Sequence, residues 1–473
     1  MRPRRLSEVA RAVEGSLAGD DVEVRSVSTD SRDVAAGSLF FALPGDRTDG
    51  HRFVDQAFAG GAAAAIVGEP VDGAVDGAVD RAVDRAVDRA VDWPGPVVRV
   101  DSTAEALMRL AADERRSMTA TVVGITGANG KTSTKDLTQA VVKSRFRVHA
   151  SPGSFNNEIG LPLTLLGAPP DTEVLVAEMG ARRIGDVKLL SGIARPDVVV
   201  VTNVGVAHME VFGSWASIVE ASAEPIDALG ADGLAILNAD DPIVIAYGDR
   251  CPGRVVTFGT RAHVDVRAED VSLGPDGRAS FRVVTDGAEV GVTLTVPGEH
   301  MVSNALAAVA VGRELGVVLD DAAVALAEAG VSRWRMETFT TAAGLRVLND
   351  AYNANPESAA AALRTARWMA GKERLIAVLG GMAELGPISE NEHDRVGELA
   401  ARIRVDRLIT VGEAAHSIAR AAIREGMGPE DVATYDTPEE ALDDIRRSAA
   451  LGDLILFKGS RIAGLETVAE ALR

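Results

Sequence analysis

Thr126-Gly-Ala-Asn-Gly-Lys-Thr-Ser133 is the stretch of this sequence that decides the fold around it. The apolar residues before it, from Thr121, predict a buried strand, and the residues after it have helical spacing as far as Lys143. A glycine-rich loop between a strand and a helix turns successive backbone N–H groups toward one point, where an anion can bind. Lys131 is placed to reach β- and γ-phosphate oxygens, and the Thr132 hydroxyl is placed to ligate Mg²⁺. The loop therefore predicts a nucleotide site.

The loop is of the short GxxGKT type, because Ile125 stands where the common form has a further glycine. A glycine-rich turn without a ligand is the alternative interpretation, but it does not explain a Lys-Thr pair at the start of the helix. We expect nucleotide contacts from the following residues: Thr126, Gly127, Ala128, Asn129, Gly130, Lys131, Thr132 and Ser133.

Strands and helices alternate on the C-terminal side of the loop. Apolar strands are predicted at 174–178, 197–201 and 234–237. This alternation indicates a doubly wound parallel sheet that is covered by helices on both faces. Residues 255–297 are typical of short antiparallel strands, and helices at 300–315 and 320–329 close this part of the chain.

Three α/β domains are predicted, which agrees with a length of 473 residues at ~150 residues per domain. A small domain spans 1–117, a central P-loop parallel-sheet domain spans 118–334, and a C-terminal Rossmann-like domain spans 335–473. The remaining strands are predicted at 22–27, 38–43, 62–67, 346–349, 375–379, 407–411 and 453–457. Residues 71–92 repeat a Val-Asp-Gly/Arg-Ala unit, which we interpret as a low-complexity surface insertion without an assigned function.

The composition excludes several classes of protein. Apolar residues make up 47% and charged residues 25% of the chain, which is typical of globular proteins and excludes wholesale disorder. The net charge of −20 repels phosphate backbones and anionic lipids, so nucleic acid is not an expected partner. Cys251 is the single cysteine, and no apolar run reaches the ~18 residues that span a bilayer. We therefore expect a cytoplasmic protein with neither a signal peptide nor a membrane segment.

Two further polar residues follow buried strands of the central domain. Glu178 ends the predicted strand 174–178, and His208 follows the strand 197–201. Ligands of open parallel sheets bind beyond the carboxyl ends of the strands, so both side chains are expected near the phosphate loop, where they can hold Mg²⁺. Alone, each is better explained as a surface-loop residue, and imidazole is an uncommon Mg²⁺ ligand. The nearby loop is what favours the metal interpretation.

Two polar segments follow strands of the third domain. Asn349-Asp-Ala-Tyr-Asn-Ala-Asn-Pro356 is dense in side-chain amides. Lys458-Gly-Ser-Arg461 places two cations where an acidic protein needs them to hold an anion. A turn stabilised by Asn side chains is the alternative for the first segment, and a basic helix-capping turn is the alternative for the second.

The chain resembles the Mur ligase family of peptidoglycan precursor synthesis over nearly its full length. Its matches to the family's scattered motifs occur in order: the phosphate loop, Glu178, His208, Gly298-Glu-His-Met-Val-Ser-Asn304, Arg335 and Asp350. It is most similar to the branch that adds D-alanyl-D-alanine to a UDP-N-acetylmuramoyl-tripeptide. The segments that point there are Ser154-Phe-Asn-Asn-Glu-Ile-Gly-Leu-Pro-Leu-Thr-Leu-Leu166, Asn349–Asn355, Gly380-Gly-Met-Ala-Glu-Leu-Gly386 and Lys458–Arg461. The branch that adds the third residue carries an Asp-Asn-Pro-Arg motif, which this sequence lacks.

The resemblance implies an ATP-dependent amide-bond ligase that activates the tripeptide carboxylate as an acyl phosphate. The implied catalytic residues are Lys131, Glu178, His208 and Arg335. Thr132 and Glu178 would hold one Mg²⁺ and His208 a second. Further ATP contacts are implied for Asn304, Arg335 and Asp350.

The resemblance also implies where the other substrates bind. Ser31 and Arg32 of the first domain are candidates for the UDP end, and Asn156 and Asn157 are candidates for the muramoyl peptide. The remaining substrate candidates are Asn353, Lys458 and Arg461, the two cations being suited to a carboxylate. We expect UDP-N-acetylmuramoyl-tripeptide and D-Ala-D-Ala as small-molecule substrates, and a monomeric protein.

One position departs from the family pattern. The family usually has a lysine, often carbamylated to bridge two Mg²⁺ ions, eight residues after a Gly-Ser pair, and this chain has Ser222 there. A serine cannot form that carbamate, so our hypothesis is that Glu220 or Glu224 supplies the carboxylate. The departure leaves two alternatives open. One is a paralogue that uses a different nucleophile, such as a D-Ala-D-lactate type, or a different acid, and the other is a nucleotide-binding regulatory protein without ligase activity.

Overall fold

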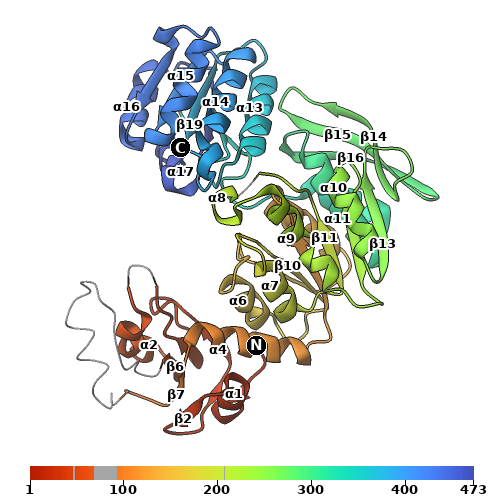
Figure 1. The fold of residues 1–473 in the computed structure, drawn as a ribbon, viewed down its shortest axis with the longest axis vertical. Helices are drawn as coiled ribbons and strands as arrows, with labels where there is room; N and C mark the ends of the chain where they lie inside the picture. Colours follow the sequence, from red (N-terminus) through yellow and green to blue (C-terminus); the bar gives the residue numbers. More distant parts are fainter. Residues whose placement is uncertain (46–47, 69–92, 207) are drawn as a thin grey trace.

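The computed structural model describes residues 1–45, 48–68, 93–206 and 208–473, which form three units, each built around its own large β-sheet (Figure 1). The repeat at 71–92 lies outside the described residues. The first and third units lie at opposite ends of the molecule, and the central unit lies between them (Figure 1). Within the described residues, no helix combines the length and the apolar character needed to cross a membrane.

The first unit is a five-stranded sheet in the order β2-β7-β6-β5-β4. Its strands are β2 (Ser16–Ala18), which is antiparallel, and the parallel β4 (Ser26–Ser28), β5 (Ser38–Phe41), β6 (Ala64–Gly68) and β7 (Val97–Val100). The single strand predicted at 22–27 is wrong, because β3 (Glu23–Val24) pairs with β1 (Arg4–Arg5) and β4 belongs to the larger sheet. Val24 and Val27 pack on one apolar core, whereas a continuous strand would turn them to opposite faces.

Helix α4 (Thr103–Ser117) joins the first unit to the central unit. It contacts α1 (Leu6–Val13) within the first unit, and α6 (Gly160–Gly167) and α7 (Asp186–Ala194) of the central unit. The buried Leu107 and Leu110 of α4 belong to one apolar core that continues into those helices. The two units therefore share a core.

The central unit is a nine-stranded sheet in the order β16-β15-β14-β13-β12-β11-β8-β10-β9, where β9 is the edge strand Val148–Ala150. Strand β8 (Thr121–Thr126) lies between β10 (Val174–Glu178) and β11 (Val198–Val201) and is parallel to both. Alternate side chains of β8 are buried on opposite faces of the sheet. Val123 and Ile125 join the core of α5 (Lys131–Lys143) and α11 (Met301–Glu314), and Val122 joins the core of α6 and α7. Burial on both faces explains the continuous apolar run, and the predicted bounds of β8 and β10 coincide with the structure.

The far edge of this sheet only partly follows the prediction. The strands there are β12 (Leu234–Asn238), β13 (Arg254–Gly259), β14 (Val266–Leu273), β15 (Arg278–Thr285) and β16 (Ala288–Pro297). Strands β14, β15 and β16 are antiparallel as predicted, but β13 is parallel to β12. The crossover through the helix α10 (Pro242–Ala246) brings β13 back to start at the same edge of the sheet as β12, so the two strands are parallel. The residues of β13 alone do not indicate this strand direction. Helix α12 (Leu319–Glu328) packs on β16.

The third unit is a six-stranded sheet in the order β17-β18-β22-β19-β20-β21. The predicted strands are observed as β18 (Arg346–Asn349), β19 (Leu375–Gly380), β20 (Arg407–Val411) and β22 (Leu454–Lys458). The antiparallel β17 (Glu337–Thr340) and the parallel β21 (Val432–Tyr435) were not predicted. Both are edge strands whose polar, partly exposed residues obscure the apolar pattern. The covering helices are α13 (Pro356–Ala370), α14 (Ser389–Arg402), α15 (His416–Arg424), α16 (Pro438–Ser448) and α17 (Leu465–Ala471).

Truncation of the shared core tests how the first two units are joined. The Leu107 side chain is fully buried, so we expect Leu107→Ala to cost about 2–5 kcal/mol of unfolding free energy. Leu451→Ala is the matched control, because Leu451 is 81% exposed and its loss should stay within about 0.5 kcal/mol. Urea unfolding followed by circular dichroism measures both. Equal effects of the two substitutions would contradict a shared core.

Candidate active site

The phosphate loop connects β8 to α5, whose first residue is Lys131. Gly127 and Gly130 have positive φ angles of 136° and 79°, which side chains rarely adopt. A Cβ atom on Gly127 would lie 2.1 Å from Thr202 Oγ1, and one on Gly130 would lie 2.5 Å from Asn304 Oδ1. Both positions therefore require glycine for the backbone angle and for space.

Part of the loop is held by the segment after β11. The Ala128 N–H donates to the Asn203 carbonyl at 3.0 Å, and the Asn129 N–H donates to Asn203 Oδ1 at 2.8 Å. These two N–H groups support the loop and do not face an anion. The donors left at the start of α5 are those of its first turn, beginning at Lys131.

Lys131 folds back over the loop. Its ammonium donates to the Gly127 carbonyl at 2.6 Å and to the Ala128 carbonyl at 3.2 Å. Burial lowers the pKa of Lys131, the Glu178 carboxylate opposes this shift, and the Arg335 guanidinium lowers the pKa further. A partly buried cation whose hydrogen bonds go to backbone carbonyls is suited to an incoming polyphosphate.

The Thr132 hydroxyl and the Glu178 carboxylate meet at the ends of two neighbouring strands. Thr132 Oγ1 donates to Glu178 Oε2 at 2.8 Å, and Asn156 Nδ2 donates to Glu178 Oε1 at 2.8 Å. Glu178 is 1% exposed, so its carboxylate is shielded from water and is held by these hydrogen bonds. A hydroxyl beside a carboxylate fits Mg²⁺, which binds proteins through one or two carboxylates and takes its other ligands from phosphate and water. Among the described residues, no group of three or more His, Cys, Asp or Glu forms a larger metal cluster.

His208 lies where the third unit meets the central one. Its Nδ1 pairs with Glu384, which follows β19, and the Glu384 carbonyl accepts the Glu210 N–H at 3.1 Å. Burial lowers the pKa of His208, and Glu384 opposes the shift. A ligating imidazole commonly donates its second nitrogen to a carboxylate, and the pairing of Nδ1 with Glu384 fits that pattern.

Other third-unit side chains also contact the loop region. Asn355 Nδ2 donates to Asn129 Oδ1 at 2.7 Å, and Glu357 Oε1 accepts the Val206 N–H at 3.2 Å. The Arg335 guanidinium lies 4.2 Å from the centroid of the Tyr352 ring, and the Tyr352 hydroxyl bonds that of Ser154. The site is therefore built from the central and the third unit together.

Sequence reasoning missed five of these contacting residues individually: Ser154, Tyr352, Asn355, Glu357 and Glu384. Four of them lie in segments that the sequence analysis quotes as family motifs, and this was the only sign in the sequence that they belong to the site. Glu357 has no such indication in the sequence.

Lys458, which was predicted to face a substrate carboxylate, is buried in the third unit. It is 3% exposed, and its ammonium lies 2.9 Å from Asp350 Oδ2. It also donates to the carbonyls of Asp350 and Asn353. The charge and the donors of this lysine are therefore engaged inside the third unit.

Other predicted residues have partners that bear on their roles. Asn157, a predicted substrate residue, accepts the Gly160 N–H on its Oδ1 at 2.8 Å and so caps α6. Asn304 is buried beneath the loop and accepts the Thr134 hydroxyl at 3.2 Å. The Arg461 guanidinium lies 4.3 Å from the centroid of the Trp334 ring and is half-exposed.

Ser31 and Arg32 lie in the first unit, in the loop between β4 and β5, away from the phosphate loop. Ser31 Oγ donates to Gln56 Oε1 at 3.2 Å. Arg32 donates to both carboxylate oxygens of Asp30, and these bonds lower the pKa of Asp30 to about 2. Arg32 is an exposed guanidinium that is available to an anion in addition to Asp30.

The hypothesis that Glu220 or Glu224 replaces the missing lysine is wrong. Both Glu220 oxygens accept from Arg250 at 2.9 Å, at the protein surface. Glu224 accepts the N–H groups of Gly185 at 2.6 Å and Lys188 at 2.8 Å, so it caps α7. The Ser222 hydroxyl bonds the Ile218 carbonyl of its own helix, α9 (Trp215–Asp227), at 2.8 Å. The carboxylate nearest to His208 comes instead from Glu384.

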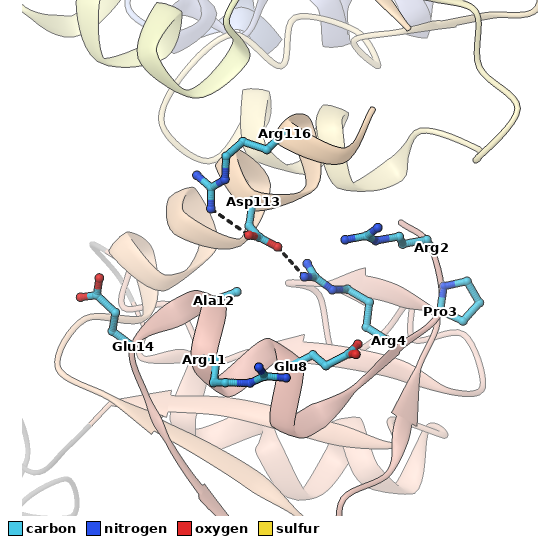
Figure 2. Close-up of a pocket in the computed structure, with 9 residues that line it drawn as sticks. All are labelled: Arg2, Pro3, Arg4, Glu8, Arg11, Ala12, Glu14, Asp113 and Arg116. Carbon is cyan, nitrogen blue, oxygen red and sulfur yellow. Dashed lines mark hydrogen bonds and ion pairs between the residues drawn. The ribbon is translucent and has the colours of Figure 1, made fainter. Parts of the chain in front are cut away.

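A cavity of about 660 Å³ lies elsewhere, on the first unit (Figure 2). It is lined by Arg2, Pro3, Arg4, Glu8, Arg11, Ala12, Glu14, Asp113 and Arg116. Asp113 pairs with both Arg4 and Arg116, so acidic groups of the protein already neutralise part of this basic lining (Figure 2). None of the predicted site residues contributes to it.

Comparison with known families and proteins gives matches along the whole chain. Three family models match: "Mur ligase family, catalytic domain" at 23–115, "Mur ligase middle domain" at 125–312, and "Mur ligase, glutamate ligase domain" at 334–461. UDP-N-acetylmuramoyl-tripeptide–D-alanyl-D-alanine ligase of Bacillus subtilis is 37% identical, covering 100% of this chain and 99% of the relative. The enzyme of the same name from Mycobacterium leprae is 40% identical, covering 94% and 92%.

Solved structures of MurF proteins are also similar to this chain over most of its length. A crystal structure of MurF from Acinetobacter baumannii superposes with a TM-score of 0.84 at 29% identity, covering 100% of this chain and 99% of that one. MurF of Thermotoga maritima in complex with ADP superposes with a TM-score of 0.77 at 29% identity, covering 95% and 97%.

Substitution of a loop glycine tests the phosphate site. We expect Gly130→Ala to weaken ATP binding by at least about tenfold, because the added Cβ strains the backbone and displaces Asn304 beneath the loop. Gly185→Ala is the control, since Gly185 has a similar φ of 96° but open space around a Cβ. Calorimetric titration with ATP and Mg²⁺ measures both variants. Equal losses would show that backbone strain alone, and not the loop, sets the affinity.

Proposed function

Since the chain belongs to the Mur ligase family, we propose that it is an ATP-dependent ligase that joins D-alanyl-D-alanine to UDP-N-acetylmuramoyl-tripeptide in peptidoglycan precursor synthesis. The observation that carries the proposal is the Thr132–Glu178 pair beside a glycine-rich loop, onto which the third unit folds Arg335 and Asn355. Relatives that match over the full length carry this ligase name, so the other nucleophile and the regulatory protein are not favoured.

The reaction has two chemical steps. The terminal carboxylate of the tripeptide attacks the γ-phosphorus of ATP, which gives an acyl phosphate and ADP. The amine of D-Ala-D-Ala then attacks the acyl carbon, and the tetrahedral intermediate collapses to the amide and inorganic phosphate. Both steps build negative charge on phosphate oxygens, so the protein must supply fixed positive groups.

The chain supplies these groups from both sides of the site. Lys131 and the first N–H groups of α5 bind the phosphates from the central unit, and Arg335 approaches them from the hinge. Thr132 and Glu178 are the proposed Mg²⁺ ligands, and His208, which pairs with Glu384, is proposed for a second ion. Bound Mg²⁺ offsets phosphate charge during transfer. Asn156 holds Glu178 in place through its amide. In this proposal Asn156 also faces the place where the tripeptide carboxylate, which accepts the phosphoryl group, binds.

The remaining parts of the proposal concern the substrates and their setting. The three separate sheets support a division into domains at 1–117, 118–334 and 335–473. Ser31 and Arg32 are assigned to the UDP end, and Asn353 and Arg461 to the peptide side. Asp350 and Asn304 remain assigned to ATP. We infer a monomer that acts in the cytoplasm, where ATP and UDP-linked precursors are found.

An assay of the whole chain tests the function. Phosphate release from ATP should require both UDP-N-acetylmuramoyl-tripeptide and D-Ala-D-Ala, and the product should gain the mass of one dipeptide less water. Lys131→Met is the control. Phosphate release by this variant should fall to background, because the ATP phosphates lose the Lys131 ammonium. Release without the dipeptide, or ATP binding without turnover, would contradict ligation of this nucleophile.

The UDP assignment has its own test. Arg32→Ala should raise the KM for the UDP-linked substrate by about 10–100-fold, the value of one charge-assisted phosphate contact, and leave ATP affinity unchanged. Arg25→Ala is matched, because Arg25 is an exposed arginine of the same unit with its own acidic partner, Glu23. A KM that does not change in Arg32→Ala would remove this residue from the site.

A further inference from the structure

The hinge between the central and third units is strained on both sides of Arg335. Trp334 and Met336 have positive φ angles of 61° and 51°, although neither is glycine. Left-handed backbone at bulky residues is costly and persists only where the surroundings hold it. Two such residues around one arginine indicate that the direction of this side chain is maintained by contacts elsewhere.

The first of these contacts runs from Met336 to Lys458. The Met336 N–H donates to Asp350 Oδ1 at 3.1 Å, and Asp350 Oδ2 lies 2.9 Å from the Lys458 ammonium. Asp350 follows β18, and Lys458 ends the neighbouring parallel strand β22. The side chains of Lys458 and Asp350 are only 4% and 15% exposed, so water offers the lysine little alternative.

The second contact runs through Tyr352. Its ring lies under the Arg335 guanidinium, at 4.2 Å, and its N–H donates to the Trp334 carbonyl at 3.2 Å. The same Lys458 ammonium donates to the Asp350 and Asn353 carbonyls, which stand on either side of Tyr352. The Lys458 ammonium therefore fixes the Asp350 carboxylate, which accepts the Met336 N–H. It also fixes the loop that carries the Tyr352 ring.

We propose that Lys458 is a positioning residue for Arg335: it fixes Asp350 and the loop 350–353, and these keep the hinge in the left-handed turn that directs the guanidinium toward the phosphate loop. The inference rests on the proposed function, because Arg335 has a phosphoryl group to act on only in that reaction. It gives Lys458 a role different from substrate binding.

A rescue experiment tests the proposal. Lys458→Met removes the cation and keeps the length of the side chain, and we expect kcat to fall by about 100-fold, as for a displaced catalytic group. The KM for D-Ala-D-Ala should not change. Adding Met336→Gly should restore at least a tenth of the wild-type kcat, because glycine adopts the positive φ without help. Adding Met336→Ala should not restore it, since alanine removes the same side chain but keeps the strain.

Asp350→Asn provides a milder version of the same test if Lys458→Met does not fold. The amide oxygen of Asn at 350 can still accept the Met336 N–H, but it carries no charge to pair with Lys458. We therefore expect a smaller loss in kcat than in Lys458→Met. Glycine at position 336 should again restore kcat, and alanine there should not. Thermal unfolding and ATP titration verify that each variant is folded.

Two results would overturn the inference. A raised KM for the dipeptide with an unchanged kcat would make Lys458 a substrate contact. A loss in kcat that glycine and alanine at 336 affect equally would show that Lys458 does not act through the hinge. Both results require an active wild-type protein, whereas failure of the proposed function would leave the wild type itself inactive.

Discussion

The hydrogen bond between the Thr132 hydroxyl and the Glu178 carboxylate is the interaction on which the arrangement of the site depends. Thr132 is fixed by the start of α5, and Glu178 by the end of β10. The two residues can meet only because β8 and β10 are adjacent and parallel, with their carboxyl ends at the same edge of the sheet. The sheet order thus converts residues 46 positions apart into one polar pair suited to a hard cation.

The third unit completes the site from the opposite side. Glu384 contacts His208, Asn355 contacts Asn129, and the Tyr352 hydroxyl contacts that of Ser154. Each contact joins a side chain of the third unit to a segment that belongs to, or borders, the central unit's site. A site divided in this way is complete only where the two units are in contact.

The Ser222 position shows how local reasoning from a motif can be incomplete. The sequence identified a missing lysine and offered Glu220 and Glu224 as substitutes, because both lie within one helical turn of it. In the structure one pairs with Arg250 and the other caps α7. The carboxylate next to His208 comes from Glu384, 176 residues away. No spacing rule connects these two residues, since their proximity depends on how two sheets face each other.

The sequence by itself determined the parallel sheets, the glycine-rich loop with Lys131 and Thr132, and the place of Glu178 at the end of a buried strand. These follow from local rules: apolar runs form buried strands, and glycines permit the turn before a helix. Only the tertiary structure decided that Lys458 and Asn157 are internal partners, that β13 is parallel, and that Glu384 lies at His208. The physical reason is that a polar side chain bonds whichever partner the fold brings within hydrogen-bond distance. For these side chains, and for the direction of β13, the neighbour is set by how distant elements pack, and local sequence patterns do not specify that packing.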